Sequence, residues 1–248
     1  MKQLLKIVLI IFLFACNKTT GDSAAFNSSG QGGSLARFTI AGHYLYTVDK
    51  QNLKVYDIAN GSQPVFKSSV PVGFEIETIF PFKDKLFIGS TSVVHIFSIE
   101  DPALPKKLAE AISPSVMRRC DPVVAMDSVA YATLRTNGPC GGIQSTLSVY
   151  NIKDVTNPIQ VGSYPVDEPY GLGYSGNTLY VCDKARGLIV FDISKPYTPQ
   201  IIKYVSVPGS DVIDVIPYNN ILVCWASDGM LVYDISNAHD PVLIKKIG

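Results

Sequence analysis

The sequence lacks several features that mark common classes of function. Lys plus Arg and Asp plus Glu both number 21, so the formal net charge is zero, and no basic stripe stands out. Because nucleic-acid-binding domains normally carry a basic surplus, we expect no nucleic-acid partner. No glycine-rich phosphate loop leads into a helix, and no segment has a helical pattern of useful length, which argues against nucleotide-binding folds.

What the chain does contain is one motif that occurs five times, an apolar strand followed by a polar turn that ends in proline. The five copies read LKVYDIANGSQP, VHIFSIEDPALP, LSVYNIKDVTNP, LIVFDISKPYTP and LVYDISNAHDP, and they end at Pro64, Pro105, Pro158, Pro199 and Pro241. The steps between these prolines are 41, 53, 41 and 42 residues. A repeat of about 40–45 residues with four short strands is typical of a β-propeller blade.

Each motif strand is predicted to be the third of four strands in its blade. Two strands precede it, joined by tight turns such as Ala41-Gly42 and Gly176-Asn177, and an outer strand follows the proline. The pattern predicts an all-β fold over residues 33–248, a five-bladed β-propeller of four-stranded antiparallel blades. No strand is left over, so we expect the first blade to pack against the fifth without strand exchange. A sandwich or barrel is the alternative, but it does not explain the proline spacing.

Residues 1–15 are predicted to be a signal peptide. Lys2 and Lys6 flank an apolar run that is too short to span a bilayer and that ends at Cys16. This segment resembles a bacterial lipoprotein signal, although Phe14 stands where a small residue is usual. We expect Cys16 to carry lipid (diacylglycerol and palmitate-type chains) and residues 16–32, rich in Ser and Gly, to form a flexible tether. The alternative is an ordinary secretory peptide or an uncleaved anchor.

The repeated pattern Leu-x-Val-Tyr-Asp-Ile-Ser resembles the LVIVD repeat of bacterial and archaeal surface proteins, most closely at Leu188–Pro199 and Leu231–Pro241. The second copy departs from it, because Ser98 stands where the others carry Asp or Asn. The segment Tyr170-Gly171-Leu172-Gly173 also looks like the lipoproteins of this family. The resemblance implies a propeller-like lipoprotein of the bacterial outer membrane, periplasmic or surface-exposed, and it implies no catalytic activity.

Two pairs of cysteines remain besides Cys16. Cys120 precedes the third inner strand, and Cys140 lies in the longer third repeat, so both are expected on one rim of one blade. An oxidising compartment favours a disulfide between them, whereas a metal or redox pair lacks a nearby histidine and the C-x-x-C spacing. Cys182 and Cys224 are expected to be buried thiols, with a bridge between blades as the alternative.

Polar residues gather at the rim where the inner strands begin, which is the usual ligand face of a propeller. The candidate ligand residues are Arg37, Glu77, Asp121, Tyr170 and Asp214. Acids near the axis suit a cation or a polyhydroxy ligand, and the alternative is that they solvate the mouth of the channel. The motif acids are interpreted differently, as caps of the turns that follow them: Asp57, Asp192 and Asp234, with Asn151 in the third blade.

The three histidines, His43, His95 and His239, fall in different blades, which argues against a histidine metal centre and a Ser-His-Asp triad. We therefore expect no metal, no cofactor and no enzymatic activity. The predicted function is a lipid-anchored binding or interaction module for a protein or glycan at the bacterial envelope. The alternative is a carbohydrate-active hydrolase or lyase that pairs rim acids such as Glu77 with Asp121 or Asp214. A third possibility is a purely structural envelope protein.

The disulfide is testable in exported protein. Reduction is expected to raise the mass of the Cys120–Cys140 peptide pair by two hydrogens, and the bond should stabilise the fold by about 2–4 kcal/mol because it closes a loop of roughly twenty residues. Mass spectrometry of alkylated digests gives the answer, and two thiols that are both alkylated without reduction would refute the pairing.

Overall fold

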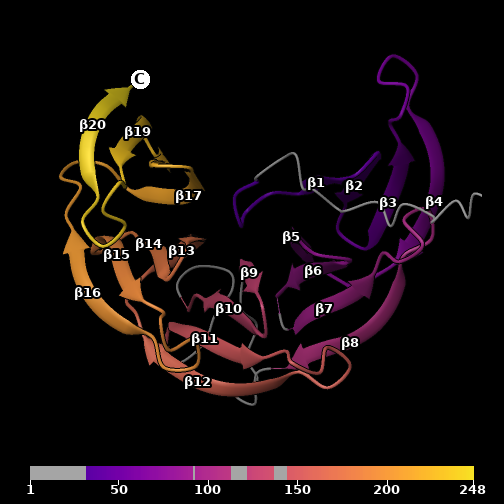
Figure 1. Cartoon of the computed structure of the whole chain (residues 1–248), viewed down its shortest axis with the longest axis horizontal. Coiled ribbons are helices and arrows are strands. Elements are labelled where there is room, and N and C mark those ends of the chain that lie inside the picture. Colours follow the sequence, from indigo (N-terminus) through magenta and orange to yellow (C-terminus); the bar gives the residue numbers. More distant parts are fainter. Residues whose placement is uncertain (1–31, 92, 113–121, 137–143) are drawn as a thin grey trace, which may run out of the picture.

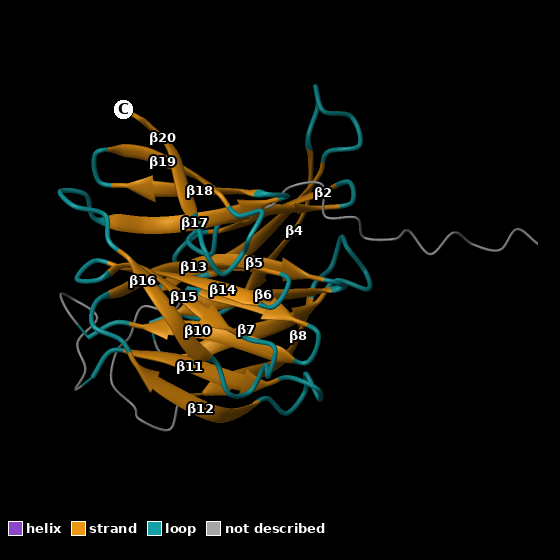
Figure 2. Ribbon diagram, turned by 60° about the vertical axis from the view of Figure 1, so that its left-hand side comes forward, coloured by secondary structure: helices purple, strands orange, loops and turns teal. Residues whose placement is uncertain are grey.

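The structure is a computed structural model that describes residues 32–91, 93–112, 122–136 and 144–248. All regular elements in these residues are strands, which form five four-stranded antiparallel sheets of consecutive strands. Figure 1 shows the sheets in chain order around a common centre, and Figure 2 shows them stacked from the side. The predicted five-bladed propeller without strand exchange is confirmed. Cys16, Cys120, Cys140 and Asp121 lie outside the described residues.

Each blade follows the same order from the centre outwards. The inner strands are β1 (Phe38–Ala41), β5 (Ile76–Phe82), β9 (Val123–Met126), β13 (Pro169–Ser175) and β17 (Val212–Tyr218). The second strands are β2 (Tyr44–Val48), β6 (Lys85–Ser90), β10 (Val129–Leu134), β14 (Thr178–Asp183) and β18 (Ile221–Ala226). The motif strands are β3 (Asn52–Asp57), β7 (Val93–Ser98), β11 (Thr146–Asn151), β15 (Gly187–Asp192) and β19 (Gly229–Asp234). The outer strands are β4 (Val65–Pro71), β8 (Lys106–Ile112), β12 (Ile159–Pro165), β16 (Gln200–Val205) and β20 (Val242–Ile247).

The motif strands are continuously apolar because both faces of a blade are covered by neighbouring blades. In β15, Leu188 and Val190 join the core shared with the fifth blade, whereas Ile189 and Phe191 join the core shared with the third. A strand buried on both faces needs no polar alternation. We call the contact surface between two consecutive blades a seam.

The motif acids cap the turns that follow them, as predicted. The N–H of Ala59 donates to Asp57 at 3.0 Å, and the N–H of Ser194 donates to Asp192 at 2.8 Å. In the second blade the hydroxyl of Ser98 takes this place and accepts from the N–H of Glu100 at 3.3 Å. A short side chain at the strand end thus satisfies a backbone donor in the turn.

A repeated tyrosine crosses three of the seams at the turn end of the blades. The third residue of the second strand donates its hydroxyl to a turn carbonyl of the next blade: Tyr46 to Pro102 at 2.9 Å, Tyr131 to Pro196 at 2.7 Å and Tyr180 to Ala238 at 2.8 Å. Phe87 and Val223 occupy this position in the second and fifth blades, and neither has a hydroxyl to donate.

The inner strands of the fourth and fifth blades approach each other closely because β13 contains two glycines. A Cβ atom on Gly173 would lie 2.7 Å from Cδ of Pro217, and one on Gly171 would lie 2.0 Å from Oδ1 of Asp214. These distances are far below van der Waals contact, so only residues without a side chain fit there. The inner strands of these two blades therefore pack directly against each other.

The first blade reaches the fourth and fifth through the residues that precede β1. The Ser34 hydroxyl donates to Oδ1 of Asp214 at 3.2 Å and accepts from the N–H of Leu172 at 2.7 Å. The N–H of Leu35 donates to Oδ2 of Asp214, also at 3.2 Å. We call these contacts of residues 33–35 the Asp214 link.

The outer parts of the first and fifth blades do not pack against each other, so the predicted closing contact is wrong. Figure 1 shows β4 and β20 well apart, and no strand of the first sheet pairs with a strand of the fifth in the described chain. Phe38 is 60% exposed and Trp225 is 52% exposed, because both lie on the faces of the first and fifth blades that are turned away from the packed seams. At the tyrosine position the fifth blade has Val223, which has no hydroxyl to donate across this gap.

In the part of the chain that the structure describes, no helix has the length and apolar character needed to cross a bilayer.

The tyrosine contacts give a direct stability test. Replacing Tyr131 with Phe leaves the carbonyl of Pro196 without its donor, so the free energy of unfolding should fall by about 1 kcal/mol. Urea unfolding followed by fluorescence measures this change. The matched control is Tyr218→Phe, because Tyr218 is exposed, and this variant should unfold like the wild type. Equal losses for both variants would contradict a specific role for the crossing hydroxyl.

Candidate functional site

The rim where the inner strands begin is shaped by β-bulges that the sequence did not reveal. The pairing of the inner with the second strand shifts between Ile76 and Thr78 in the second blade and between Pro169 and Leu172 in the fourth. A bulge leaves one residue outside the ladder and turns its side chain in a new direction. Glu77 and Tyr170 are released from the regular pairing in this way, at matching places of the two blades.

Four side chains from four different blades form what we call the rim cluster: Arg37, Glu77, Arg135 and Tyr170. The Arg135 guanidinium lies 3.9 Å from the centre of the Tyr170 ring, in cation–π geometry. Arg37 donates from Nη2 to the carbonyl of Ile76 at 2.7 Å, which fixes it beside Glu77. Each member comes from the start of an inner strand or, for Arg135, from the end of a second strand, so all four lie on one face.

The electrostatics of the cluster centre on Glu77, which is half-buried. Burial raises the pKa of Glu77, while the positive charges of Arg135 and Arg37 act in the opposite direction. A partly desolvated carboxylate beside two guanidinium groups is a strong hydrogen-bond acceptor for a ligand hydroxyl or amide. The sequence also places Arg135 on this rim, in the loop between the second and third strands of the third blade, and the structure adds its stack on Tyr170.

The loop that leads into β13, and so to Tyr170, is held by Asp183 at the end of β14. Its carboxylate accepts the N–H groups of Asp167 at 3.0 Å and Glu168 at 3.1 Å, and also those of Ala185 and Arg186, both at 3.0 Å. Burial raises the pKa of Asp183, against the lowering effect of these donors. Tyr170 therefore follows directly after a loop that is held by hydrogen bonds.

Asp214, the predicted rim residue of the fifth blade, has a different environment. It is buried and accepts from Ser34, from the N–H of Leu35 and from the N–H of Val215 at 3.0 Å. Burial raises the pKa of Asp214 to about 6, although these donors lower it. Of the predicted rim residues, the structure thus brings Arg37, Glu77 and Tyr170 together, places Asp214 in the link beneath them, and leaves Asp121 outside the described residues.

The remaining candidate groups do not assemble into a metal centre in the described part of the chain, where no cluster of three or more His, Cys, Asp or Glu side chains could hold an ion. His95 is buried and its Nδ1 lies 3.1 Å from Glu110. Cys182 and Cys224 are buried, unbridged thiols that neighbour each other across the seam of the fourth and fifth blades, and burial raises the pKa of Cys182. Their predicted state as buried thiols is confirmed.

The sheets and the rim define the class of the protein, a β-propeller built from repeated blades. The family model of the LVIVD repeat matches residues 32–72 and 172–206, in agreement with the resemblance seen in the motif. No curated protein is significantly similar to the chain in sequence.

Solved structures share the fold at low sequence identity. The computationally designed protein Ika8 is 15% identical with a TM-score of 0.61, over 85% of this chain and 60% of that one. A functionally unknown protein from Desulfotomaculum acetoxidans is 16% identical with a TM-score of 0.64, over 83% and 68% respectively. A chain of a nidogen/laminin complex is 13% identical with a TM-score of 0.54, over 80% and 73%. The chain thus spans about 60% of the length of Ika8, which is less than two thirds.

The Asp214 link should make stability depend on pH. The pKa of Asp214 in the folded protein lies above its ordinary value of 3.8, so its contribution is full at low pH and is lost as the pH rises through about 6. Between about pH 4 and pH 7 this loss amounts to at most about 3 kcal/mol in the free energy of unfolding.

Urea unfolding of the wild type and of Asp214→Asn across this range measures the effect. The variant should lose less stability than the wild type as the pH rises, because it has no proton to release. Glu77 and Asp183, whose pKa values are also raised, remain in both proteins, so the difference between the two profiles isolates Asp214. Parallel profiles would contradict the assignment.

Proposed function

We propose that this protein is a binding or interaction module, held by lipid on Cys16 at the bacterial outer membrane, and that a protein or glycan ligand docks on the rim cluster. The observation that supports this most is the convergence of one side chain from each of four blades at one mouth. Arg37 and Tyr170, the first and last residues of the cluster, are 133 positions apart in the chain. They belong to one cluster only because the ring brings the ends of the blades together. The domain is proposed to face the periplasm or the cell exterior.

The chemistry of the cluster suits a polar, uncharged or mixed-charge ligand. Glu77 accepts hydrogen bonds, whereas the two arginines donate them in fixed planar arrays. Arg135 is stacked on Tyr170, which limits its rotamers before a ligand arrives and lowers the entropy lost on binding. Sugar hydroxyls and peptide backbone groups both match this mixture of donors and acceptors.

A binding role fits the charges around Glu77 better than hydrolysis does. Glycoside hydrolysis usually needs two carboxyl groups at a set separation across the scissile bond. The charges that act on Glu77 most strongly are those of Arg135 and Arg37, and the Glu75 carboxylate has a smaller effect and accepts the Thr91 hydroxyl at 2.7 Å. Asp214 is already bonded by three donors beneath the rim. We therefore propose a protein without enzymatic activity.

A screen of the purified full chain against glycan and protein arrays tests the proposal. Once a ligand is found, Glu77→Gln should weaken binding roughly tenfold to a hundredfold, because one hydrogen bond to a charged group is lost. Arg135→Lys keeps the charge but loses the planar stack on Tyr170, so it should also bind more weakly. Calorimetry gives both affinities.

Lys153→Gln is the control, because Lys153 is exposed in the turn at the other end of the third blade, and its affinity should equal that of the wild type. Full binding by both rim variants would contradict the rim as the site. Turnover of a saccharide that disappears in Glu77→Gln would favour the hydrolase instead, and arrays without any ligand would favour a structural envelope protein.

A further inference from the structure

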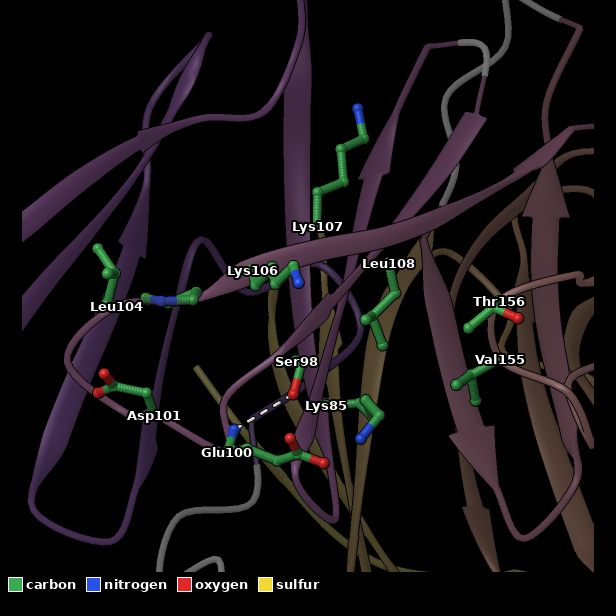
Figure 3. A pocket seen from close by; sticks show the side chains of 11 residues that line it. Lys85, Ser98, Glu100, Asp101, Leu104, Lys106, Lys107, Leu108, Val155 and Thr156 are labelled. Atoms are coloured by element: carbon green, nitrogen blue, oxygen red, sulfur yellow. Dashed lines mark hydrogen bonds between the residues drawn. The ribbon is translucent and has the colours of Figure 1, made fainter.

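The seam between the second and third blades lacks the tyrosine contact described above. Phe87 stands at the tyrosine position, so the turn residue that corresponds to Pro102, Pro196 and Ala238, namely Val155, receives no hydroxyl from it. A cavity of about 740 Å³ opens at this place, and Val155 and Thr156 form one of its walls (Figure 3). It lies at the turn end of the blades, on the face opposite the rim cluster.

The same cavity contains the one motif position that departs from the repeat, Ser98. In the other blades this position holds Asp or Asn, and uncharged residues stand opposite it on both neighbouring strands: Tyr44 and Val65, Val129 and Ile159, Thr178 and Gln200, Ile221 and Val242. In the second blade Lys85 and Lys106 stand opposite Ser98. Directly opposite residues on a sheet share a face and lie close together. In the second blade the motif position is therefore uncharged and its two neighbours are positive, whereas in the first, fourth and fifth blades the motif position is negative and its neighbours are uncharged.

The two lysines differ in their pairing. Lys85 is mostly buried and lies 2.6 Å from Asp84. Lys106 forms no ion pair with any residue that the structure describes, and Figure 3 shows it on the other side of Ser98 from Lys85. Two further acids line the cavity. Asp101 caps its own turn by accepting from the N–H of Ala103 at 3.1 Å, and Glu100 is the second acid of the lining.

The rest of the lining is apolar apart from Thr156 and Lys107, and Lys107 pairs with Glu110 at 2.6 Å. Leu104, Leu108 and Val155 surround the polar centre, and Leu104 is largely exposed, so the cavity offers an apolar wall next to its lysines. A cavity of this size with convergent polar groups is typical of a small-molecule site. The lysines select negative charge, and the apolar wall selects a hydrocarbon portion attached to it.

We propose that this cavity binds an oxyanion, a carboxylate or phosphate group, carried on an apolar chain. The oxyanion lies between Lys85 and Lys106, where the motif carboxylate lies in other blades, and the Ser98 hydroxyl donates to it. The apolar chain packs against Leu104, Leu108 and Val155. This site is independent of the proposed rim function, because it uses different blade ends and different residues.

Calorimetric titration of the purified full chain with octanoate, with an alkyl phosphate and with inorganic phosphate tests the proposal. The wild type should bind at least one of the two amphiphiles, and more tightly than inorganic phosphate. Ser98→Asp restores the carboxylate that Asp57, Asp192 and Asp234 carry at the same position, so it should fold normally and bind about tenfold or more weakly. Lys106→Met should weaken binding by a similar factor, because it removes the unpaired positive charge.

Two further variants serve as controls. Glu100→Gln removes the competing acid and should tighten binding. Asp192→Ser introduces serine at the same motif position of the fourth blade. Thr178 and Gln200 stand there in place of the two lysines, so this variant should gain no second binding site for the amphiphiles. Binding by octanoate alone assigns the head group as carboxylate, and binding by the alkyl phosphate alone assigns it as phosphate. Equal affinity of wild type and Ser98→Asp, or no binding of either amphiphile, would overturn the proposal.

Discussion

The arrangement of this propeller depends on one buried carboxylate. Asp214 accepts from Ser34, Leu35 and Val215, and its two outside donors come from the segment that precedes the first blade. Gly171 makes room for it, since any side chain there would overlap its oxygens. A buried carboxylate is costly unless it is well bonded. Here its bonds join the segment before the first blade to the fifth blade, and the Ser34 hydroxyl in turn accepts from the N–H of Leu172 in the fourth. The outer edges of the first and fifth blades then remain free to lie apart.

The blades are repeats in sequence but not equal in their contacts. Three seams share the tyrosine that crosses to the next turn, whereas Phe87 and Val223 interrupt the series. One interruption coincides with the cavity beside Ser98, and the other with the unpacked edge of the fifth blade. Because stability in a repeat fold is roughly a sum over neighbouring units, such local losses are tolerated. At these two places the blades therefore differ from the other copies of the repeat.

The two faces of the ring offer different chemistry. The rim cluster combines an acceptor, two guanidinium groups and an aromatic ring, which suits a polar ligand. The cavity at the turn end combines lysines with apolar walls, which suits an amphiphilic anion. A domain tethered through its N-terminal segment would present both faces to the space around it. The repeated blades give the scaffold, and the proposed cavity site lies where the second blade departs from the repeat.

The sequence by itself determined the number of blades, the order of strands and the turn caps, because proline spacing and apolar runs are local features that recur. It also indicated Arg37, Glu77 and Tyr170 as residues of one rim. Only the tertiary structure decided that Arg135 stacks on Tyr170 and that Asp214 is buried and bonded to Ser34. Bulges, the close approach that Gly171 and Gly173 allow, and the unpacked edge of the last blade depend on contacts between residues far apart in the chain. No local pattern encodes such contacts, since each one forms only after the blades have taken their places.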